Sequence, residues 1–292
     1  MKTTNKNNIP EIVIRAMHRT NAAYSRGDAD ISVTQLISPP RIVNLKEKHY
    51  KEMSIDASDA MFMLLGSAVH HIIEAGATDE IVEERLFSDV EGWRLSGAID
   101  LQEEEGKKLF ITDYKVTSAF KVIKGDYEDW VLQQNIYAWL IKNNKNRTVQ
   151  GIRICAIIRD WTRSEIGRKA GYPKAPVVLI DLPVWPYDEI DSYVRNRIKL
   201  HQEARLASKI GYPLPDCTIS DQWGSETKYA IKKKGAKRAT KLYTTREQAE
   251  LELEDGYEIE PRPGRRARCE GDYCGVAKWC NQFKRERERS GK

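Results

Sequence analysis

The chain of 292 residues is 40% hydrophobic and 31% charged with a net charge of +5, a composition that describes a globular protein and argues against a disordered one. Its length fits one large domain or a core with a small appendage. No stretch approaches the roughly 18 uninterrupted apolar residues of a membrane helix, and the N-terminus MKTTNKNNIPE lacks the apolar core of a signal peptide. We therefore expect a cytoplasmic protein with no membrane partner.

Hydrophobic periodicity predicts the elements of the chain. Apolar residues recur at helical spacing in three long segments, and they alternate or run continuously in five shorter ones. This order of elements is typical of a mixed α/β sheet with helices packed on it. In chain order we expect a helix at 10–26, a short helix or turn that ends at Pro39-Pro40, a helix at 57–76, a strand at 81–87, a hairpin of 92–102 and 107–116 with Gly106 in its turn, a helix at 126–143, strands at 148–161 and 176–185, and a helix at 187–209.

The character of the sequence changes after GYPLPDC, which ends at Cys217. A basic strand pair, a short helix at TTREQAELEL and the strand YEIEPRPG follow, and they look like a small insert framed by Cys217 and Cys269. We therefore expect a core at residues 1–210, and a basic insert with a cysteine region at residues 211–292.

Basic residues concentrate in the last quarter of the chain. Residues 228–243 hold seven Lys and Arg and no acid, and residues 261–292 hold ten Lys and Arg against four Asp and Glu. Such a concentration is typical of a surface that binds phosphates; the alternative is a solvated basic face without a ligand. The candidate DNA contacts are Lys232, Lys233, Lys234, Lys237 and Arg238.

The predicted strand LFITDYKV places an acid and a base on one face of the sheet. Residues two apart in a strand share a face, so Asp113 and Lys115 project together. If the hairpin turns near Gly106, Asp100 lies opposite or diagonal to Asp113. Two carboxylates at one site repel each other unless a cation lies between them, and Mg²⁺ is the natural candidate. For the D-x-K pattern alone, a cross-strand salt bridge is the alternative.

Four short motifs surround this hairpin in order: GSAVH at 66–70, GAID at 97–100, DYK at 113–115 and QQNIY at 133–137. Together they resemble the G-x-x-x-H, G-x-x-D, (D/E)-x-K and Q-x-x-x-Y motifs of RecB-type nucleases in the PD-(D/E)xK superfamily. That group includes AddB-like nuclease domains, CRISPR-associated RecB-like exonucleases and phage recombination nucleases. The resemblance spans about residues 60–140 and implies a restriction-endonuclease-like core, in which helices flank a mixed central sheet.

The resemblance also implies a metal site and a catalytic lysine. Asp100 and Asp113 would be ligands of Mg²⁺ or Mn²⁺, and His70, on the helix ahead of the hairpin, would be a further ligand. Lys115 would orient or help to deprotonate an attacking water, or stabilise the charge that develops on the phosphorus centre.

Two further positions are implied by the same resemblance. Gln133 and Tyr137, one helical turn apart, would shape the site and contact DNA. One of Glu83 and Glu84 would match an acidic position ahead of G-x-x-D, and the sequence does not choose between them.

Three of the five cysteines, Cys269, Cys274 and Cys280, fall within twelve residues. In a cytoplasmic chain such a cluster indicates a metal before a disulfide. The spacing C-x₄-C-x₅-C is similar to the C-x₂-C-x₅-C of iron–sulfur members of this family, in which an upstream cysteine completes the [4Fe–4S] site. Because the first gap is longer by two and no cysteine precedes the nuclease motifs, Cys217 is the expected fourth ligand. Zn²⁺ is the alternative, and free thiols are a third interpretation.

The implied activity is that of a Mg²⁺-dependent DNA nuclease, with an exonuclease in recombination, repair or phage DNA processing favoured. It would hold the DNA backbone without reading sequence, with a recombination protein as a further partner and the bacterial host cytoplasm as its location if a phage encodes it. The alternative is a non-catalytic DNA-binding or scaffold subunit that retains the fold. The sequence does not specify polarity of degradation, end or strand preference, or oligomeric state.

Overall fold

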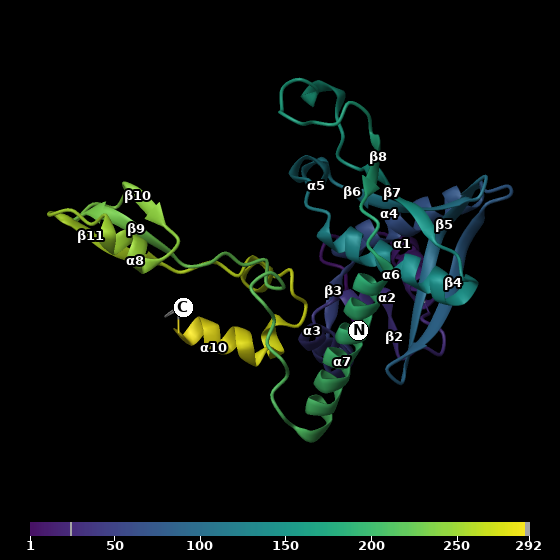
Figure 1. The fold of residues 1–292 in the computed structure, drawn as a ribbon, viewed down its shortest axis with the longest axis horizontal. Coiled ribbons are helices and arrows are strands. Elements are labelled where there is room, and N and C mark those ends of the chain that lie inside the picture. Colours follow the sequence, from purple (N-terminus) through teal and green to yellow (C-terminus); the bar gives the residue numbers. More distant parts are fainter. Residues whose placement is uncertain (24, 290–292) are drawn as a thin grey trace. The chain divides into compact units, whose positions relative to one another are not determined.

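A computed structural model describes residues 1–23 and 25–289 of the chain (Figure 1). Tyr24, in the first predicted helix, and the last three residues of the expected C-terminal region lie outside the described residues. The segment around the two adjacent prolines was expected in the core but groups with the C-terminal region instead. The first compact unit comprises Met1–Ser38 and Ser54–Glu203, and the second comprises Pro39–Met53 and Ala204–Lys292.

The first unit is built on a six-stranded mixed sheet with the order β2-β5-β6-β7-β8, to which β4 adds by pairing with β5. The β6–β7 and β2–β5 pairs are parallel and the other pairs are antiparallel. The mixed sheet expected from the sequence is therefore confirmed. The strands are β2 (Ile31–Ser32), β4 (Ile81–Val90), β5 (Trp93–Glu105), β6 (Lys108–Thr117), β7 (Val149–Ile158) and β8 (Val177–Leu182).

Two hairpins set the register of the strands that matter for the site. The β4–β5 turn has Glu91 and Gly92 at φ of 50° and 74°, and the β5–β6 turn has Gly106 at 64°. Positive φ is the conformation that tight hairpin turns require, and glycine adopts it without steric cost. The predicted turn at Gly106 is confirmed, and the paired residues run from Glu105–Lys108 to Leu101–Thr112.

Helices lie against this sheet and close its core (Figure 1). Ile136, Leu140 and Ile141 of α6 are fully buried in one cluster with β-branched residues of the sheet such as Ile99 and Ile111. The short helix α5 was not expected from the sequence, and neither was a two-stranded parallel pair of β1 and β3. The remaining elements are β1 (Lys2–Thr4), α1 (Glu11–Ala23), α2 (Val33–Ile37), β3 (Ser54–Asp56), α4 (Ala57–Glu74), α5 (Ala119–Lys124), α6 (Glu128–Lys145), a 3₁₀ turn (Arg163–Glu165) and α7 (Tyr187–Ile210), whose last turns belong to the second unit.

A glycine allows α6 to lie close on β5. A Cβ on Gly97 would come within 2.7 Å of the Tyr137 ring and 2.8 Å of the Leu140 side chain. Such distances are shorter than real Cβ contacts, so only glycine fits between these elements. The glycine of the GAID motif therefore fixes how closely the helix approaches the strand that carries Asp100.

The second unit contains a three-stranded antiparallel sheet of order β10-β9-β11 and several short helices. The basic strand pair, the short helix and the following strand expected here are all present. Among the described residues, no helix is both long and apolar enough to cross a membrane. The elements are α3 (Pro40–His49), a 3₁₀ turn (Tyr50–Glu52), β9 (Lys228–Lys233), β10 (Lys241–Tyr243), α8 (Arg246–Leu251), β11 (Tyr257–Arg262), α9 (Ala267–Glu270), a 3₁₀ turn (Ala277–Trp279) and α10 (Asn281–Arg289).

Candidate active site and cysteine cavity

A cavity of about 440 Å³ in the first unit collects every residue predicted to be catalytic. They come from four elements far apart in the sequence, which the sheet and its helices bring to one place. The lining residues from the motifs are His70 of α4, Asp100 of β5, Asp113 and Lys115 of β6, and Gln133 and Tyr137 of α6.

The hairpin sets the two aspartates side by side. The last printed pair of the β5–β6 ladder is Leu101 with Thr112, and one further step along this register brings Asp100 opposite Asp113. The backbone N–H of Tyr114 donates to Asp100 Oδ2 over 2.9 Å, which closes the ladder with a side chain in place of a carbonyl. The Asp100 carboxylate is therefore fixed against the neighbouring strand.

His70 faces two carboxylates through one ring nitrogen. Its Nε2 lies 2.9 Å from the Tyr114 carbonyl, which only accepts, so Nε2 carries a proton and donates it. Nδ1 lies 3.4 Å from Glu83 Oε1 and 3.5 Å from Asp100 Oδ2. The hydrogen bond to Glu83, together with the negative charges of Asp100 and Asp113, raises the pKa of His70 despite the opposing effect of burial. In the neutral ring, the Nδ1 lone pair would point at the space between the two carboxylates.

Glu83, and not Glu84, lies at this site. Glu84 is paired with Lys145 and accepts a hydrogen bond from Gln102 over 2.6 Å. The β4–β5 register skips Glu83, between the pairs Val82–Leu101 and Glu84–Ile99, and the Glu83 backbone has a φ of 49° within the strand. A non-glycine residue rarely adopts this conformation, and such strain clusters at functional sites. One ligand atom each of His70, Glu83 and Asp100 lie within 4.8 Å of one another.

The surroundings of Asp100 favour a proton or a cation on its carboxyl group. Burial, and then the negative charge of Asp113, raise the pKa of Asp100 to about 7, although His70 and Lys115 oppose the shift. Near pH 7, a carboxyl group with such a pKa is partly protonated unless a cation binds to it and takes the place of the proton. The site is therefore built to gain when a positive ion binds between its carboxylates.

Asp113 has a partner that sequence reasoning missed. Lys115 Nζ lies 2.7 Å from Asp113 Oδ2 and 3.0 Å from Oδ1, and Gln134 Nε2 donates to Oδ1 over 2.7 Å. Gln134 is fully buried. Burial lowers the pKa of Lys115, but the attraction of Asp113 outweighs it and the net pKa is raised, so the lysine keeps its charge. A doubled glutamine within a buried helix face was the one signal for Gln134, and the motif directed attention to its neighbour, Gln133.

The two residues of the Q-x-x-x-Y motif interact with each other. Gln133 Nε2 donates to the Tyr137 hydroxyl over 2.8 Å, as their spacing of one helical turn permits. Both line the cavity next to the carboxylates. The residues present fit a hard divalent cation, since they offer carboxylate oxygens and an imidazole nitrogen.

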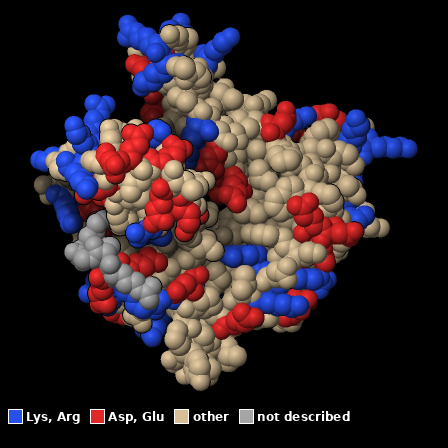
Figure 2. Space-filling model, turned by 60° about the vertical axis from the view of Figure 1, so that its left-hand side comes forward, with Lys and Arg blue, Asp and Glu red and all other residues tan. Residues whose placement is uncertain are grey.

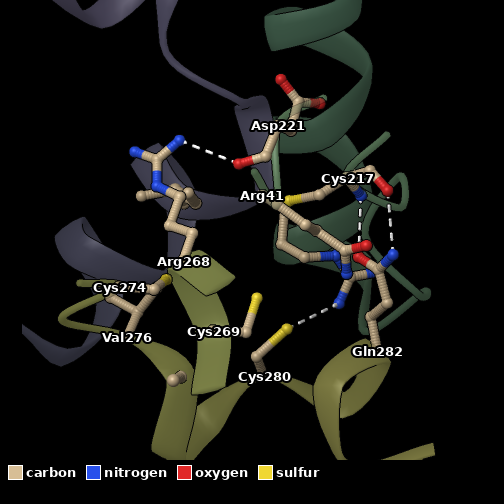
Figure 3. A pocket seen from close by; sticks show the side chains of 12 residues that line it. Arg41, Cys217, Asp221, Arg268, Cys269, Cys274, Val276, Cys280 and Gln282 are labelled. Atoms are coloured by element: carbon tan, nitrogen blue, oxygen red, sulfur yellow. Dashed lines mark hydrogen bonds between the residues drawn. The ribbon is translucent and has the colours of Figure 1, made fainter. Parts of the chain in front are cut away.

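The second unit contains a separate, small cavity that all four predicted cysteines line (Figure 3). Cys269, Cys274 and Cys280 are buried, and Cys217 is half-buried. Burial raises the pKa of Cys217 to about 12 and that of Cys269 to about 11, and neighbouring acidic groups add to the effect. Without a metal, these thiols therefore stay protonated at neutral pH.

The spacing of the four sulfurs tests which metal they fit. Thiolates about 2.3 Å from a tetrahedral zinc lie about 3.8 Å from one another. Within the described ranges the cysteine sulfurs form no group of three inside 4.8 Å, and their cavity leaves room for about one water-sized sphere. A four-iron cluster places metal and sulfide between its thiolates and spreads them further apart than zinc does. Four thiols that line one cavity are a donor set that either a four-iron cluster or a zinc ion can use.

Two polar side chains that the sequence did not single out hold this cavity together (Figure 3). Arg41, 4% exposed, donates to the carbonyls of Leu214 and Pro215 and lies 3.9 Å from Cys280 Sγ. Gln282 accepts from the Cys217 N–H over 2.7 Å and donates to its carbonyl over 2.9 Å. Each fixes the backbone next to a cysteine.

The basic residues predicted to contact DNA lie on β9 and in the loop that follows. Lys232 is engaged within the small sheet, at 2.5 Å from Glu260 and 3.4 Å from Glu258 on β11. The others are exposed, namely Lys233, Lys234, Lys237 and Arg238. Four of the five predicted residues thus remain accessible.

One family of proteins matches this chain over most of its length. The family model described as the PD-(D/E)XK nuclease superfamily matches residues 46–281. Among solved structures, the chain is similar to SSO0001 at 16% identity with a TM-score of 0.46, over 65% of this chain and 85% of that one. It is also similar to a "putative exonuclease" from Eubacterium rectale at 11% identity with a TM-score of 0.29, over 70% and 76%. A search of the curated proteins gives no match.

Proposed function

Because this chain belongs to the PD-(D/E)XK nuclease superfamily, we propose that it is a Mg²⁺- or Mn²⁺-dependent DNA nuclease that acts as an exonuclease. The observation that carries the proposal is the convergence of His70, Glu83 and Asp100 within 4.8 Å, beside the Asp113–Lys115 pair. Recombination, repair or phage DNA processing in the cytoplasm is the process that such an enzyme would serve.

In this proposal His70, Asp100 and Asp113 bind the cation, with Glu83 as an additional ligand that the geometry brings in. When bound, a divalent ion would polarise the scissile phosphate and lower the pKa of a water molecule. Glu83 and Asp100 supply the negative charge that holds the ion. Asp113, on the adjacent strand, lines the same cavity and would complete the set of ligands.

Lys115 and the α6 residues act on the DNA itself. The Lys115 ammonium stays charged because Asp113 pairs with it, so it can stabilise charge that develops on the phosphate in the transition state. Gln133 and Tyr137 present an amide and a hydroxyl to the same cavity, where they would orient the DNA strand. The exposed cations after β9 would hold the DNA backbone without reading sequence.

For the second unit we propose a [4Fe–4S] cluster on Cys217, Cys269, Cys274 and Cys280, with a structural role. The lining of one cavity by all four cysteines supports a shared metal site, and the choice of iron–sulfur over zinc rests on the resemblance of the cysteine spacing to that of iron–sulfur relatives. Protein purified without oxygen should be brown and contain iron and sulfide. Colourless protein with one equivalent of zinc would contradict the assignment.

The nuclease proposal is tested with linear duplex, circular and single-stranded DNA in the presence of Mg²⁺ or Mn²⁺. Asp113→Ala and Lys115→Ala should each lose cleavage by about a thousandfold or more while the fold is retained. The matched pair Glu83→Gln and Glu84→Gln separates the site from its surroundings, because only Glu83 faces His70.

Four results would contradict the proposal. Wild-type protein that binds DNA but cleaves none under any of these conditions would indicate a scaffold. Full activity of Asp113→Ala or Lys115→Ala would show that these residues do not form the active site. Equal losses of cleavage activity in Glu83→Gln and Glu84→Gln would show that Glu83 is not a ligand of the cation. Cleavage of circular DNA at the rate of linear DNA would replace the exonuclease with an endonuclease.

A further inference from the structure

The helix α4 is apolar but mostly uncovered. Four consecutive or neighbouring residues in its first half are exposed, namely Met61 at 38%, Phe62 at 58%, Met63 at 44% and Leu65 at 41%. In the described structure only Ala57 and Ala60 of this helix are buried. A contiguous apolar surface of this kind marks an interaction site more often than single exposed residues do.

An arm formed by residues 159–176 lies between β7 and β8, at the top of Figure 1. Its base is closed by hydrogen bonds from Trp161 Nε1 to the Pro173 carbonyl, over 2.9 Å, and from the Thr162 N–H to the Tyr172 hydroxyl, over 2.8 Å. Tyr172 is buried at this base. The arm is therefore a shaped projection of the first unit, with a defined root.

The arm has a surplus of cations. Residues 159–174 hold five Lys and Arg against two acids. Both acids are engaged internally, since Asp160 accepts from the Ala119 N–H over 2.7 Å and Glu165 pairs with Lys169. Figure 2 shows Lys and Arg gathered at the end of the arm, at the top of the view. Four cations have no carboxylate partner among the described residues, namely Arg159, Arg163, Arg168 and Lys174.

The root of the arm adjoins both the catalytic strand and α4. The Arg159 N–H donates to the Thr117 carbonyl over 2.9 Å, and Thr117 lies two residues, about 7 Å, beyond Lys115 along β6. The Arg159 guanidinium lies 4.5 Å from the centre of the Phe62 ring. Phe62 precedes His70 by eight residues, about 12 Å along the helix axis.

A second exposed aromatic ring lies on α5, next to the root of the arm. Phe120, at the start of α5, is 70% exposed. Its neighbour Ala119 is buried against the arm's root, in one cluster with Tyr172. One exposed ring on α4 and one on α5 therefore lie by the root of the cationic arm, next to the end of β6 that carries Lys115.

We propose that this surface is a platform that binds single-stranded DNA and leads it to the active site, an inference that rests on the proposed nuclease function. Phe62 and Phe120 stack on bases, and Arg159, Arg163 and Arg168 bind phosphates. Stacking on aromatic rings combined with a cationic track is the mode by which proteins hold single strands, and every base has a face to offer. In a duplex the faces of the bases are stacked on each other and cannot contact the rings. An apolar protein partner would not provide anionic groups for the unpaired cations of the arm.

The test measures binding of the full chain to a fluorescent oligothymidine and to a blunt duplex by fluorescence anisotropy, in EDTA and over a salt series. The double variant Arg163→Glu/Arg168→Glu is compared with Lys107→Glu/Lys108→Glu. The second pair reverses as many exposed charges at the other end of β6. Phe120→Ala is compared with Tyr212→Ala, because these rings are 70% and 69% exposed.

We expect the arm variant to weaken single-strand binding at least tenfold. Loss of two phosphate contacts should also lower the salt slope by about 1.4. Phe120→Ala should weaken binding about tenfold with little change in slope. Both controls should stay within about twofold of the wild type.

Equal losses in an arm variant and its control would overturn the platform, and so would duplex binding as tight as single-strand binding. The measurement does not depend on catalysis. If the wild type cleaves no DNA with any cation, the nuclease proposal fails while the platform can still be seen in EDTA. If cleavage is normal and the arm variants bind as the wild type does, only the platform fails.

Discussion

The two candidate metal sites of this chain differ in how far they are assembled by the protein alone. In the first unit a hydrogen bond holds each metal ligand that the sequence predicts. Asp100 accepts from the Tyr114 N–H, Asp113 accepts from Gln134, and His70 donates to the Tyr114 carbonyl. In the second unit Gln282 holds the backbone at Cys217, but burial raises the pKa of the Cys217 and Cys269 thiols and so opposes the loss of the protons that metal binding requires.

The difference teaches where each site draws its stability. The carboxylate site is built into a sheet whose apolar core is independent of any cation, so an ion binds to a structure that already exists. The cysteine cavity has short helices and few buried apolar residues around it. Its thiols must lose protons to bind a metal, and the energy of that binding becomes folding energy of the unit.

The largest effect should therefore follow from a cysteine substitution. Cys274→Ser should abolish the visible colour and leave the second unit sensitive to protease, because structural metal sites contribute on the order of 10 kcal/mol. The first unit should keep its melting transition. Cys155→Ser, on β7 of the first unit, is the control. A Cys274→Ser protein that keeps its metal and its protease resistance would refute the contrast between the sites.

In the first unit a single buried hydrogen bond tests the opposite half of the comparison. Gln134→Leu keeps the volume but removes the donor to Asp113, so the carboxylate can turn away from the cation. We expect turnover and the affinity for the divalent cation to fall about 10- to 100-fold, as for other partners of metal ligands. A well-folded variant with normal Mg²⁺ dependence would show that Gln134 only fills space.

Most of the carboxylate site could be predicted because its motifs fix residue types at defined spacing in defined elements. The turn at Gly106 determines the register, and the register places Asp100 against Asp113 without further information. The choice between Glu83 and Glu84 could not be made, because it depends on a local distortion of β4 that turns Glu83 towards His70. Gln134 was hidden by its neighbour, which matches the motif.

The composition of the second unit could not be predicted for a different reason. Pro39–Met53 lies in the middle of residues that form the first unit, yet Arg41 binds backbone more than 170 residues later in the chain. Local patterns contain no information about such a pairing. The DNA-contacting role of the β9 cations remains a prediction, and the pairing of Lys232 with two glutamates narrows it to the other four residues.

The two motif glycines should respond in opposite directions to the same change. Gly97→Ala forces a Cβ into Tyr137 and Leu140, and overpacking of this kind costs about 1–3 kcal/mol. Gly66 has nothing within 4 Å of its would-be Cβ and lies inside α4. Gly66→Ala should therefore raise the free energy of unfolding by about 0.5–1 kcal/mol. Urea denaturation measures both values, and a stabilised Gly97→Ala would contradict the close packing of α6 on β5.

The smallest effect is a pH-dependent change of thermal stability on binding of the cation. It tests whether the carboxylates of the first site destabilise the folded protein when no cation is bound. The folded-state pKa of Asp100, about 7, lies above that of an unfolded aspartate, about 3.9. Without a cation the folded state binds more protons between these values, so its free energy of unfolding falls as pH rises from about 4 to 7. The raised pKa of His70 acts in the same direction, since its stabilising proton is lost as pH rises. A divalent cation competes with these protons, so Mg²⁺ should raise the melting temperature by several degrees at about pH 8 and hardly at about pH 5. Asp100→Asn should remove this difference, and a shift of equal size at both pH values in the wild type would place the cation elsewhere.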